Sequence, residues 1–343
     1  MKINREKFLK SLLAVAPGLA RREDIEQSTS FVFSNGFAYT FDDKLSCIAP
    51  SLLPEEWTAV VLAKPLMEFL QQIGDEQVNV AITNTKMLVV GKEDKAAFRI
   101  DTKITLPIDL IGALAEWYDL PPNFADAVKV VSECGSNDEQ RFQLTCIHIT
   151  ADFMEACDNV QVARYTISLG LDSEVLVSHK SLRAVADMKP TQIGVTDNWL
   201  SFRNEEVVFS CRRFLDEYPD LSAILDTNGA PFTLPADLGG KLDLANIFSS
   251  RDTDDDKVFI TLRENLMLIE GQSAVGKYKG RKKVEYSGPD IRFRISPVLL
   301  ADITSRTPVC EMSETRLKVT GENFVYVSCL SRVEEPIVNT TEE

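Results

Sequence analysis

The chain has 343 residues, of which 44% are hydrophobic and 8% aromatic, which is enough apolar material for two or three buried cores. It carries 37 Lys and Arg against 52 Asp and Glu, a formal net charge of −15. These values exclude a wholly disordered chain and a uniformly basic nucleic-acid-binding protein, although they are compatible with a local basic surface. No apolar run approaches the roughly 18 residues of a membrane span, so we expect no membrane partner.

The N-terminal segment, MKINREKFLKSLLAVAPGLARRED, has charges on both sides of a short amphipathic stretch and no A-x-A cleavage site. We interpret it as a mature cytoplasmic start, not as a signal peptide. Seven widely spread cysteines without a C-x-x-C pair argue against a disulfide framework or zinc site and predict small buried side chains. The only histidines are His148 and His179, which leaves little material for histidine chemistry.

The first predicted element is a helix over Arg5–Leu19. Its apolar stripe has helical spacing and consists of Phe8, Leu12, Val15 and Leu19. Lys7 and Lys10 lie on the opposite face of that helix, and Arg21 and Arg22 follow it. The Asn35-Gly36 pair then predicts a hairpin between two short strands.

An internal repeat organises the rest of the chain. Residues 62–100, 177–213 and 295–330 each predict a helix of about ten residues followed by three strands. The helix anchors Leu66, Leu182 and Leu299 are 116 and 117 residues apart. The alternative interpretation is a chance alignment of three patterns, but the second-strand leucines keep a similar period.

A weaker half-repeat precedes each of these segments. It begins with an amphipathic helix, over Arg5–Leu19, Asn123–Cys134 and Lys241–Phe248, and continues with alternating strands, which in the middle unit cover residues 142–158. The sequence therefore predicts an α+β fold of three tandem domains, each with two helices packed on antiparallel sheets. The expected boundaries are 1–117, 118–230 and 231–333, followed by an acidic tail over 334–343.

Two segments resemble known motifs and fail on inspection. Gly271–Tyr278 nearly matches a P-loop, but Tyr278 replaces the Mg²⁺-binding hydroxyl and no helix signal follows. Asp252–Asp256 resembles the start of an EF-hand loop, but Lys257 replaces the turn glycine and Arg263 replaces the bidentate Glu. We expect no catalytic residue, no metal site and no cofactor.

Lys and Arg concentrate on the polar faces and ends of the predicted helices, whereas Asp and Glu concentrate in strands and loops. This pattern predicts a basic, helix-lined surface on an acidic body, which attracts phosphates without reading sequence. The alternative is that each residue belongs to an ordinary solvated helix face. The candidate DNA-binding residues are Lys7, Lys10, Arg21, Arg22, Lys129, Lys180, Arg183, Lys189 and Lys241.

With three units of about 115 residues, basic helices and an acidic remainder, the chain resembles the bacterial sliding clamps, the β subunit family of DNA polymerase III. The most specific local match is Tyr218-Pro219-Asp220-Leu221 with Ile224-Leu225, at a place where the family carries Phe or Tyr, Pro, Asp and a hydrophobic residue. The chain departs from the family at Cys157–Val162, where a Thr-Asp-Gly-His-Arg-Leu segment is common, and at its acidic tail. These departures suggest a phage or otherwise remote clamp.

The resemblance implies a processivity factor that performs no chemistry. Two chains would form a head-to-tail homodimeric ring around double-stranded DNA, without base recognition, and tether a DNA polymerase. A clamp loader would be a further partner. The helices would line the hole and the sheets would face outward.

The resemblance also implies two protein-binding sites. The partner-peptide pocket would contain Val160, Val162, Pro219, Ile224, Leu225, Val327, Cys329 and Leu330. Because Gln161 replaces the family's Arg, a bound peptide would lose a charged partner. The dimer interface would pair Ile247 and Phe248 with Leu106, Ile108, Leu110 and Ile111. For both sets the alternative is ordinary core.

Two other functions stay open from the sequence. One is a non-encircling clamp-fold adaptor or decoy. The other, of a different class, is a nucleotide-dependent enzyme that uses Gly271–Tyr278.

Overall fold

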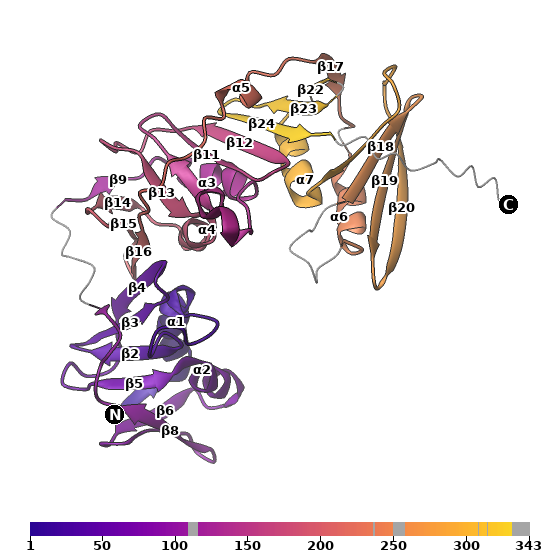
Figure 1. Ribbon diagram of the computed structural model, residues 1–343. Helices are drawn as coiled ribbons and strands as arrows, with labels where there is room; N and C mark the ends of the chain where they lie inside the picture. The colour runs from indigo at the N-terminus through magenta and orange to yellow at the C-terminus, as the bar shows by residue number, and fades with distance from the viewer. Residues whose placement is uncertain (109–115, 236, 250–257, 308, 314, 331–343) are drawn as a thin grey trace. The chain divides into compact units, whose positions relative to one another are not determined.

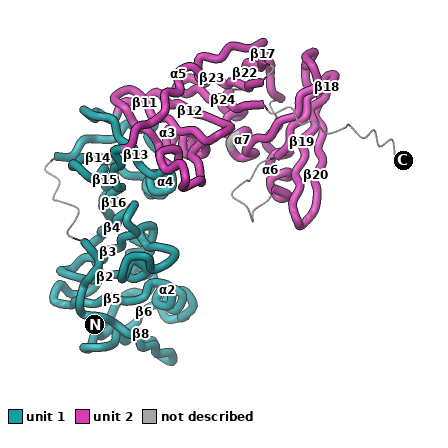
Figure 2. The backbone as a smooth tube through the Cα atoms, in the orientation of Figure 1, with its two compact units in different colours: residues 1–125, 169–215 teal, residues 126–168, 216–343 magenta. Residues whose placement is uncertain are grey.

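The computed structural model describes residues 1–108, 116–235, 237–249, 258–307, 309–313 and 315–330 (Figure 1). The chain forms two compact units, coloured separately in Figure 2. Unit 1 consists of Met1–Ala125 and Leu169–Leu215, and unit 2 of Asp126–Ser168 and Asp216–Glu343. Each unit therefore combines part of the middle repeat with one flanking repeat.

Unit 1 contains one long antiparallel sheet and most of its helices pack on that sheet. Its N-terminal elements are β1 (Lys2–Asn4), α1 (Arg5–Val15), the 3-10 helix η1 (Ala16–Gly18), β2 (Ser30–Ser34), β3 (Phe37–Phe41), β4 (Leu45–Pro50), β5 (Ala59–Leu62), α2 (Ala63–Gln72), β6 (Gln77–Ile82), β7 (Lys86–Val90) and β8 (Lys95–Asp101). Its later elements are β9 (Tyr118–Asp119), β13 (Val175–Ser178), α4 (His179–Asp187), β14 (Gln192–Val195), β15 (Trp199–Arg203) and β16 (Val208–Arg212).

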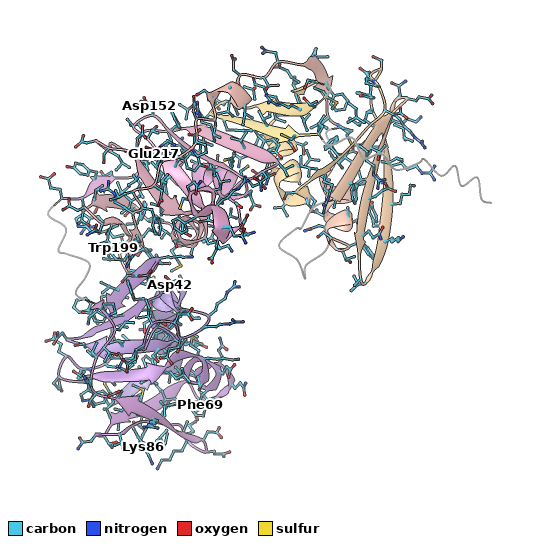
Figure 3. The ribbon with its side chains drawn as sticks, viewed as in Figure 1. Asp42, Phe69, Lys86, Asp152, Trp199 and Glu217 are labelled. Carbon is cyan, nitrogen blue, oxygen red and sulfur yellow. The ribbon has the colours of Figure 1, made fainter. Side chains whose placement is uncertain are left out.

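The sheet of unit 1 continues from the first repeat into the middle one. Its strand order is β1-β6-β7-β8-β5-β2-β3-β4-β16-β15-β14-β9, and β4 joins β16 through pairs such as Cys47 with Phe209. Trp199, labelled in Figure 3, closes this junction, with its ring centroid 6.0 Å from that of Phe41 and the Arg212 guanidinium 5.4 Å above it. The junction is thus both hydrogen-bonded and packed.

Unit 2 contains two sheets. Its elements are α3 (Phe124–Ser132, of which the first two residues belong to unit 1), the 3-10 helix η3 (Glu139–Thr145), β10 (Cys146–Ile149), β11 (Phe153–Cys157), β12 (Gln161–Thr166), α5 (Ser222–Leu225), β17 (Ala230–Thr233), α6 (Gly239–Asn246), β18 (Val258–Arg263), β19 (Leu266–Ser273), β20 (Gly276–Lys283), β21 (Ile291–Ile295), α7 (Pro297–Arg306), β22 (Val309–Met312), β23 (Arg316–Thr320) and β24 (Phe324–Cys329). One sheet has the order β10-β11-β12-β24-β23-β22-β17, and the other β20-β19-β18-β21. The pairing of β12 with β24 joins the middle repeat to the last one.

The predicted unit of one helix and three strands is confirmed in all three places. It appears as α2 with β6–β8, as α4 with β14–β16, and as α7 with β22–β24. The anchors Leu66 and Leu182 are fully buried, because the apolar stripe of each helix packs on its sheet. The helix predicted over Lys241–Phe248 is observed two residues earlier, at Gly239–Asn246.

Two boundary predictions were wrong for local reasons. The first helix ends at Val15 instead of Leu19, because Pro17 has no N–H to donate and the chain tightens into η1. Residues 142–145 were predicted as strand, but they form the end of η3, which Asp138 caps by accepting a hydrogen bond from the Gln140 N–H at 3.0 Å. The segment before β10 is therefore the end of a capped 3-10 helix and not a continuation of the strand.

The cores confirm the predicted burial of cysteines. All seven are free thiols, and six of them are buried, Cys329 being exposed. Burial raises the pKa of the Cys310 thiol to about 12, so this side chain behaves as a small apolar group. Among the helices of the described residues, none is long and apolar enough to cross a membrane.

Candidate DNA-facing helices and protein-binding surfaces

In unit 1 the candidate DNA-binding residues lie on exposed positions of α1 and just after it. Phe8, Leu12 and Val15 are buried, which turns Lys7 and Lys10 to solvent on the opposite face of α1. The Lys10 ammonium lies 2.6 Å from the Glu206 carboxylate, but both side chains are exposed, so water screens this pair. Arg21 and Arg22, which follow η1, are exposed as well.

The second group of candidates lies on α4, again in unit 1. Leu182, Val185 and Ala186 are buried against the sheet, while Lys180 is exposed and Arg183 half-buried. The Arg183 guanidinium lies 3.6 Å from the carboxylate of Asp187, one turn later. Lys189 follows the helix in a left-handed conformation, with φ of 52°, and its side chain is exposed.

In unit 2 the candidate Lys129 belongs to an ion-pair network that the sequence analysis missed. Its ammonium lies 2.6 Å from the Asp302 carboxylate of α7, and Arg306, on the same helix as Asp302, binds the Asp126 carboxylate with both terminal nitrogens at 2.5 and 2.6 Å. The Tyr165 hydroxyl of β12 donates to Asp126 at 3.0 Å.

This network, which we call the α3–α7 ion-pair network, stabilises contacts between helices of two repeats. The hydrogen bonds from Arg306 are the main cause that lowers the pKa of Asp126. Because Lys129 and Arg306 each face a carboxylate, this part of unit 2 offers less free positive charge to a phosphate than α1 or α4. The remaining candidate of unit 2, Lys241 on α6, is half-buried. Asp126 and Arg306 are 180 positions apart, and no sequence pattern predicts that they form an ion pair.

The candidate peptide-binding residues come together in an apolar cluster of unit 2. Val162, Leu225 and Val327 are buried in it, and Ile224 packs against it while partly exposed. The other members of the cluster, which the sequence analysis did not assign to the pocket, are Leu144, Cys157, Leu221, Tyr218 and Val325. All of these except Leu144 lie within a few residues of candidate pocket residues. Their closeness in sequence to those candidates could therefore have indicated that they belong to the same cluster.

The remaining candidates lie around this cluster. Cys329 donates its N–H to the Val160 carbonyl at 2.7 Å, which fixes the end of β24 beside the β11–β12 turn. Val160 is half-buried, Pro219 and Cys329 are exposed, and Leu330 is buried. Val160, Pro219 and Ile224 therefore form a partly exposed apolar surface. The buried residues of the cluster lie beneath it.

Tyr218 positions the segment that supplies much of this surface. Its ring stacks on His148 with centroids 4.9 Å apart, and its hydroxyl accepts the Cys157 N–H at 3.0 Å. His148 is in turn 2.9 Å from Glu155, which also pairs with Arg164 at 2.7 Å. Burial raises the pKa of Tyr218, so the phenol is a neutral anchor.

Gln161 serves the fold and not a ligand. Its side chain is 7% exposed, donates to the Glu133 carbonyl at 2.9 Å, and accepts the Tyr326 hydroxyl at 3.1 Å. The polar atoms of the residue that stands in the place of the family's Arg are therefore engaged inside unit 2.

The candidate dimer residues differ in accessibility. Ile247 is 53% exposed directly after α6, and Phe248 is half-buried, with its ring 6.3 Å from that of Tyr278. Leu106 is 3% exposed in a core cluster with Phe41 and Trp199, so its side chain offers no surface to a partner. Gln27 fixes this segment by accepting the N–H groups of Thr105 and Leu106.

Ile108 packs partly buried against the same core cluster of unit 1. Leu110 and Ile111 lie outside the described residues, as does the acidic run Asp252–Asp256.

The P-loop-like segment forms a β-hairpin. Gly271 pairs with Tyr278 in the ladder between β19 and β20, and the turn residues are Ala274 and Val275. Its backbone amides are thus in strand pairing and no helix follows, so the segment cannot cradle a phosphate as a P-loop does. Within the described residues, no group of three or more His, Cys, Asp or Glu is arranged to hold a metal ion.

Three solved structures with similar folds are DNA polymerase III beta subunits, two of them described as sliding clamps. The DNA polymerase III subunit beta from Bartonella birtlesii, bound to griselimycin, superposes with a TM-score of 0.76 at 17% identity. The clamp from Pseudomonas aeruginosa, also bound to griselimycin, gives 0.74 at 16%, and the beta subunit from Thermotoga maritima gives 0.73 at 16%. Each alignment covers 97% of this chain and 99% of the other.

The chain therefore has the sliding-clamp fold over nearly its whole length. The sequence matches no family model and no curated protein. The fold resemblance expected from the repeat is thus confirmed by structure.

The α3–α7 ion-pair network makes stability depend on pH at its acid end. Because the native pKa of Asp126 is lowered, its contribution is complete above the unfolded value of about 3.9 and is lost as pH falls through the lower native value. We expect Asp126→Asn to reduce the free energy of unfolding by about 1 kcal/mol at neutral pH, since the pair is partly exposed. Urea unfolding across pH measures this difference, which should disappear at the acid end.

The control is Glu285→Gln, which changes the same charge at an exposed position of unit 2. A loss of stability in Asp126→Asn that does not vary with pH, or one no larger than in the control, would contradict this role of the ion pair.

Proposed function

We propose that the protein is a DNA sliding clamp, a processivity factor that encircles duplex DNA and tethers a DNA polymerase. The observation that carries the proposal is a fold that matches sliding clamps over 97% of this chain and 99% of theirs. The match extends to all three helix-and-strand repeats and is not confined to one domain. The proposed domains are the repeats 1–117, 118–230 and 231–333.

The surface chemistry supports contact with DNA through phosphates alone. The candidates Lys7, Arg21, Arg22, Lys180 and Lys189 are exposed and lie on or beside two helices of unit 1. Lysine and arginine on a helix surface attract the backbone of any sequence, so binding of this kind permits sliding. No chemical step is needed, and the function we propose is not enzymatic.

The apolar cluster of unit 2 supports a site for partner proteins. An apolar segment of a polymerase or of a clamp loader would cover Ile224, Pro219 and Val160, while buried Val162 and Val327 form the floor. Because Gln161 is engaged internally, we propose that apolar contacts dominate recognition here.

The ring requires two chains, and we propose a head-to-tail homodimer in the cytoplasm. Ile247 is the most exposed of the candidate contact residues that the structure describes, and Phe248 and Ile108 are partly exposed beside their own cores. Leu106 is left out of the proposed contact because it is core.

Charge reversal tests the DNA surface. We expect the variant Lys7→Glu, Lys10→Glu, Lys180→Glu to bind duplex DNA at least tenfold more weakly and to lower the salt slope by about 0.9 for each lost phosphate contact. Fluorescence anisotropy over a range of salt concentrations measures both quantities.

The matched control is Lys86→Glu, Lys92→Glu, Lys95→Glu, which makes the same charge change on exposed residues in and beside β7 and β8 (Lys86 is labelled in Figure 3). If both triple variants lose the same affinity, the effect is net charge and the helix surface is not the DNA contact.

A substitution at the edge of the apolar cluster tests the partner site. We expect Ile224→Asp to weaken binding of a short apolar peptide from a bacterial DNA polymerase by at least tenfold, because a carboxylate in an apolar contact must be desolvated. Val309→Asp, at another exposed apolar position of unit 2, is the control and should bind as the wild type does. Equal affinity in all three proteins, with unchanged thermal unfolding, would remove this site.

Solution mass tests the ring. The wild type should have about twice the chain mass of 38.3 kDa, and Ile247→Ala should shift the population toward monomer, because burying this side chain contributes roughly 1.5–3 kcal/mol. Val275→Ala, at an 80% exposed turn position, should leave the dimer intact. A wild type that stays monomeric at high concentration would favour the non-encircling adaptor, and a dimer unaffected by Ile247→Ala would place the contact elsewhere.

A further inference from the structure

The sheet formed by β18–β21 has two faces of opposite character. One face is apolar and packs toward α6, which in turn packs on α7, and both helices lie beside the sheet in Figure 1. Its side chains are buried, among them Val258, Ile260, Leu262, Ile269 and Phe293. The other face is turned away from these helices.

Strand register places an unusual number of basic residues on that second face. Lys279 pairs with Glu270 and Arg281 with Leu268, while Arg294 pairs with Phe259 across the adjacent strands. Because directly paired residues share a face, the set can be read along all four strands. It consists of Arg263, Lys277, Lys279, Arg281, Lys283, Arg292 and Arg294.

Glu270 is the one acid among the residues of these four strands on this face. It lies 3.2 Å from the Lys279 ammonium and 3.3 Å from the Arg292 guanidinium, so its single charge is shared. This strongly basic surface, which we call the β18–β21 basic face, belongs to a chain whose net charge is −15. It corrects the expectation that acidic residues dominate the strands.

The four basic residues of β20 are exposed and regularly spaced, whereas Arg263, Arg292 and Arg294 are half-buried. Lys277, Lys279, Arg281 and Lys283 are all exposed and alternate along β20, the edge strand, so successive charges are about 6.8 Å apart. Arg292 and Arg294 lie with their guanidinium carbons 4.5 and 5.3 Å from the centre of the Phe259 ring. The face therefore combines a row of ammonium and guanidinium groups with a stacked aromatic and guanidinium surface.

We propose that the β18–β21 basic face binds single-stranded DNA, independently of sequence. Regular positive charges follow a phosphate backbone, and the guanidinium planes at Phe259 offer a surface on which bases stack. This goes beyond the proposed clamp function, which uses the helices and duplex DNA.

Shape favours a single strand over the other polyanions. The charges extend over four strands, about 14 Å across, and follow the twist of the sheet. A stiff duplex meets such a surface along one line of phosphates, whereas a flexible strand follows it. An acidic peptide would satisfy the charges but would leave the stacking surface unused.

The test measures binding of a fluorescently labelled oligothymidylate to the full chain. The variant Lys277→Glu, Arg281→Glu, Lys283→Glu should bind at least tenfold more weakly than the wild type. Its salt slope should fall by about 2, since each lost phosphate contact on a single strand contributes about 0.7. The control is again Lys86→Glu, Lys92→Glu, Lys95→Glu, which should retain wild-type affinity for the oligonucleotide, and thermal unfolding should be unchanged in both.

Three results would overturn the proposal. One is equal oligonucleotide affinity of the face variant and the control. Another is tighter binding of a duplex of the same length that is lost in the face variant. The third is displacement of the oligonucleotide from the face by a poly-glutamate peptide at lower charge concentration. The helix variant Lys7→Glu, Lys10→Glu, Lys180→Glu should keep its affinity for the oligonucleotide, so failure here is distinguishable from failure of the clamp proposal.

Discussion

Strand pairing between repeats is the interaction on which the rest of this structure depends. β4 pairs with β16 and β12 pairs with β24, so two of the three sheets run from one repeat into the next and leave no unpaired edge at these junctions. Each helix must then bury its apolar stripe on the sheet of its own repeat, as Leu66 and Leu182 do. The polar faces of α1 and α4 are exposed as a consequence, and this is where the candidate Lys and Arg lie.

The repeat was predictable because it rests on local periodicity. Helical spacing in α2, α4 and α7 and alternation in the strands that follow are encoded within each segment, and the period of about 116 residues tied them together. Contacts between distant segments were not predictable in the same way. Nothing in the sequence pairs Asp126 with Arg306, and nothing in the alternation of Leu106 and Ile108 shows that Leu106 is bound into a core through Gln27. Such residues are fixed by topology, which one sequence does not state.

The β18–β21 basic face could have been predicted from the sequence, but part of its sequence was compared with a phosphate-binding loop instead of with a strand. The run GKYKGRKK begins inside Gly271–Tyr278, the segment that was compared with a phosphate-binding loop and fails as one. As a strand, the same run places every second residue on one face, and Lys277, Lys279, Arg281 and Lys283 become a single row. Charge therefore gathers on two surfaces of an acidic chain, the helices of unit 1 and the β18–β21 basic face. We propose different forms of nucleic acid for the two surfaces, because one is built on the faces and ends of helices and the other on a twisted sheet.

The central claim is that the chain holds DNA by topology, with the charged helices guiding but not fixing the duplex. The most direct measurement loads the protein on nicked circular duplex DNA, removes free protein by gel filtration, and then linearises half of the sample with a restriction enzyme. The account predicts that protein stays with the circles at moderate salt and is lost from the linear molecules. Equal retention on circular and linear DNA, or none on either, would contradict encirclement.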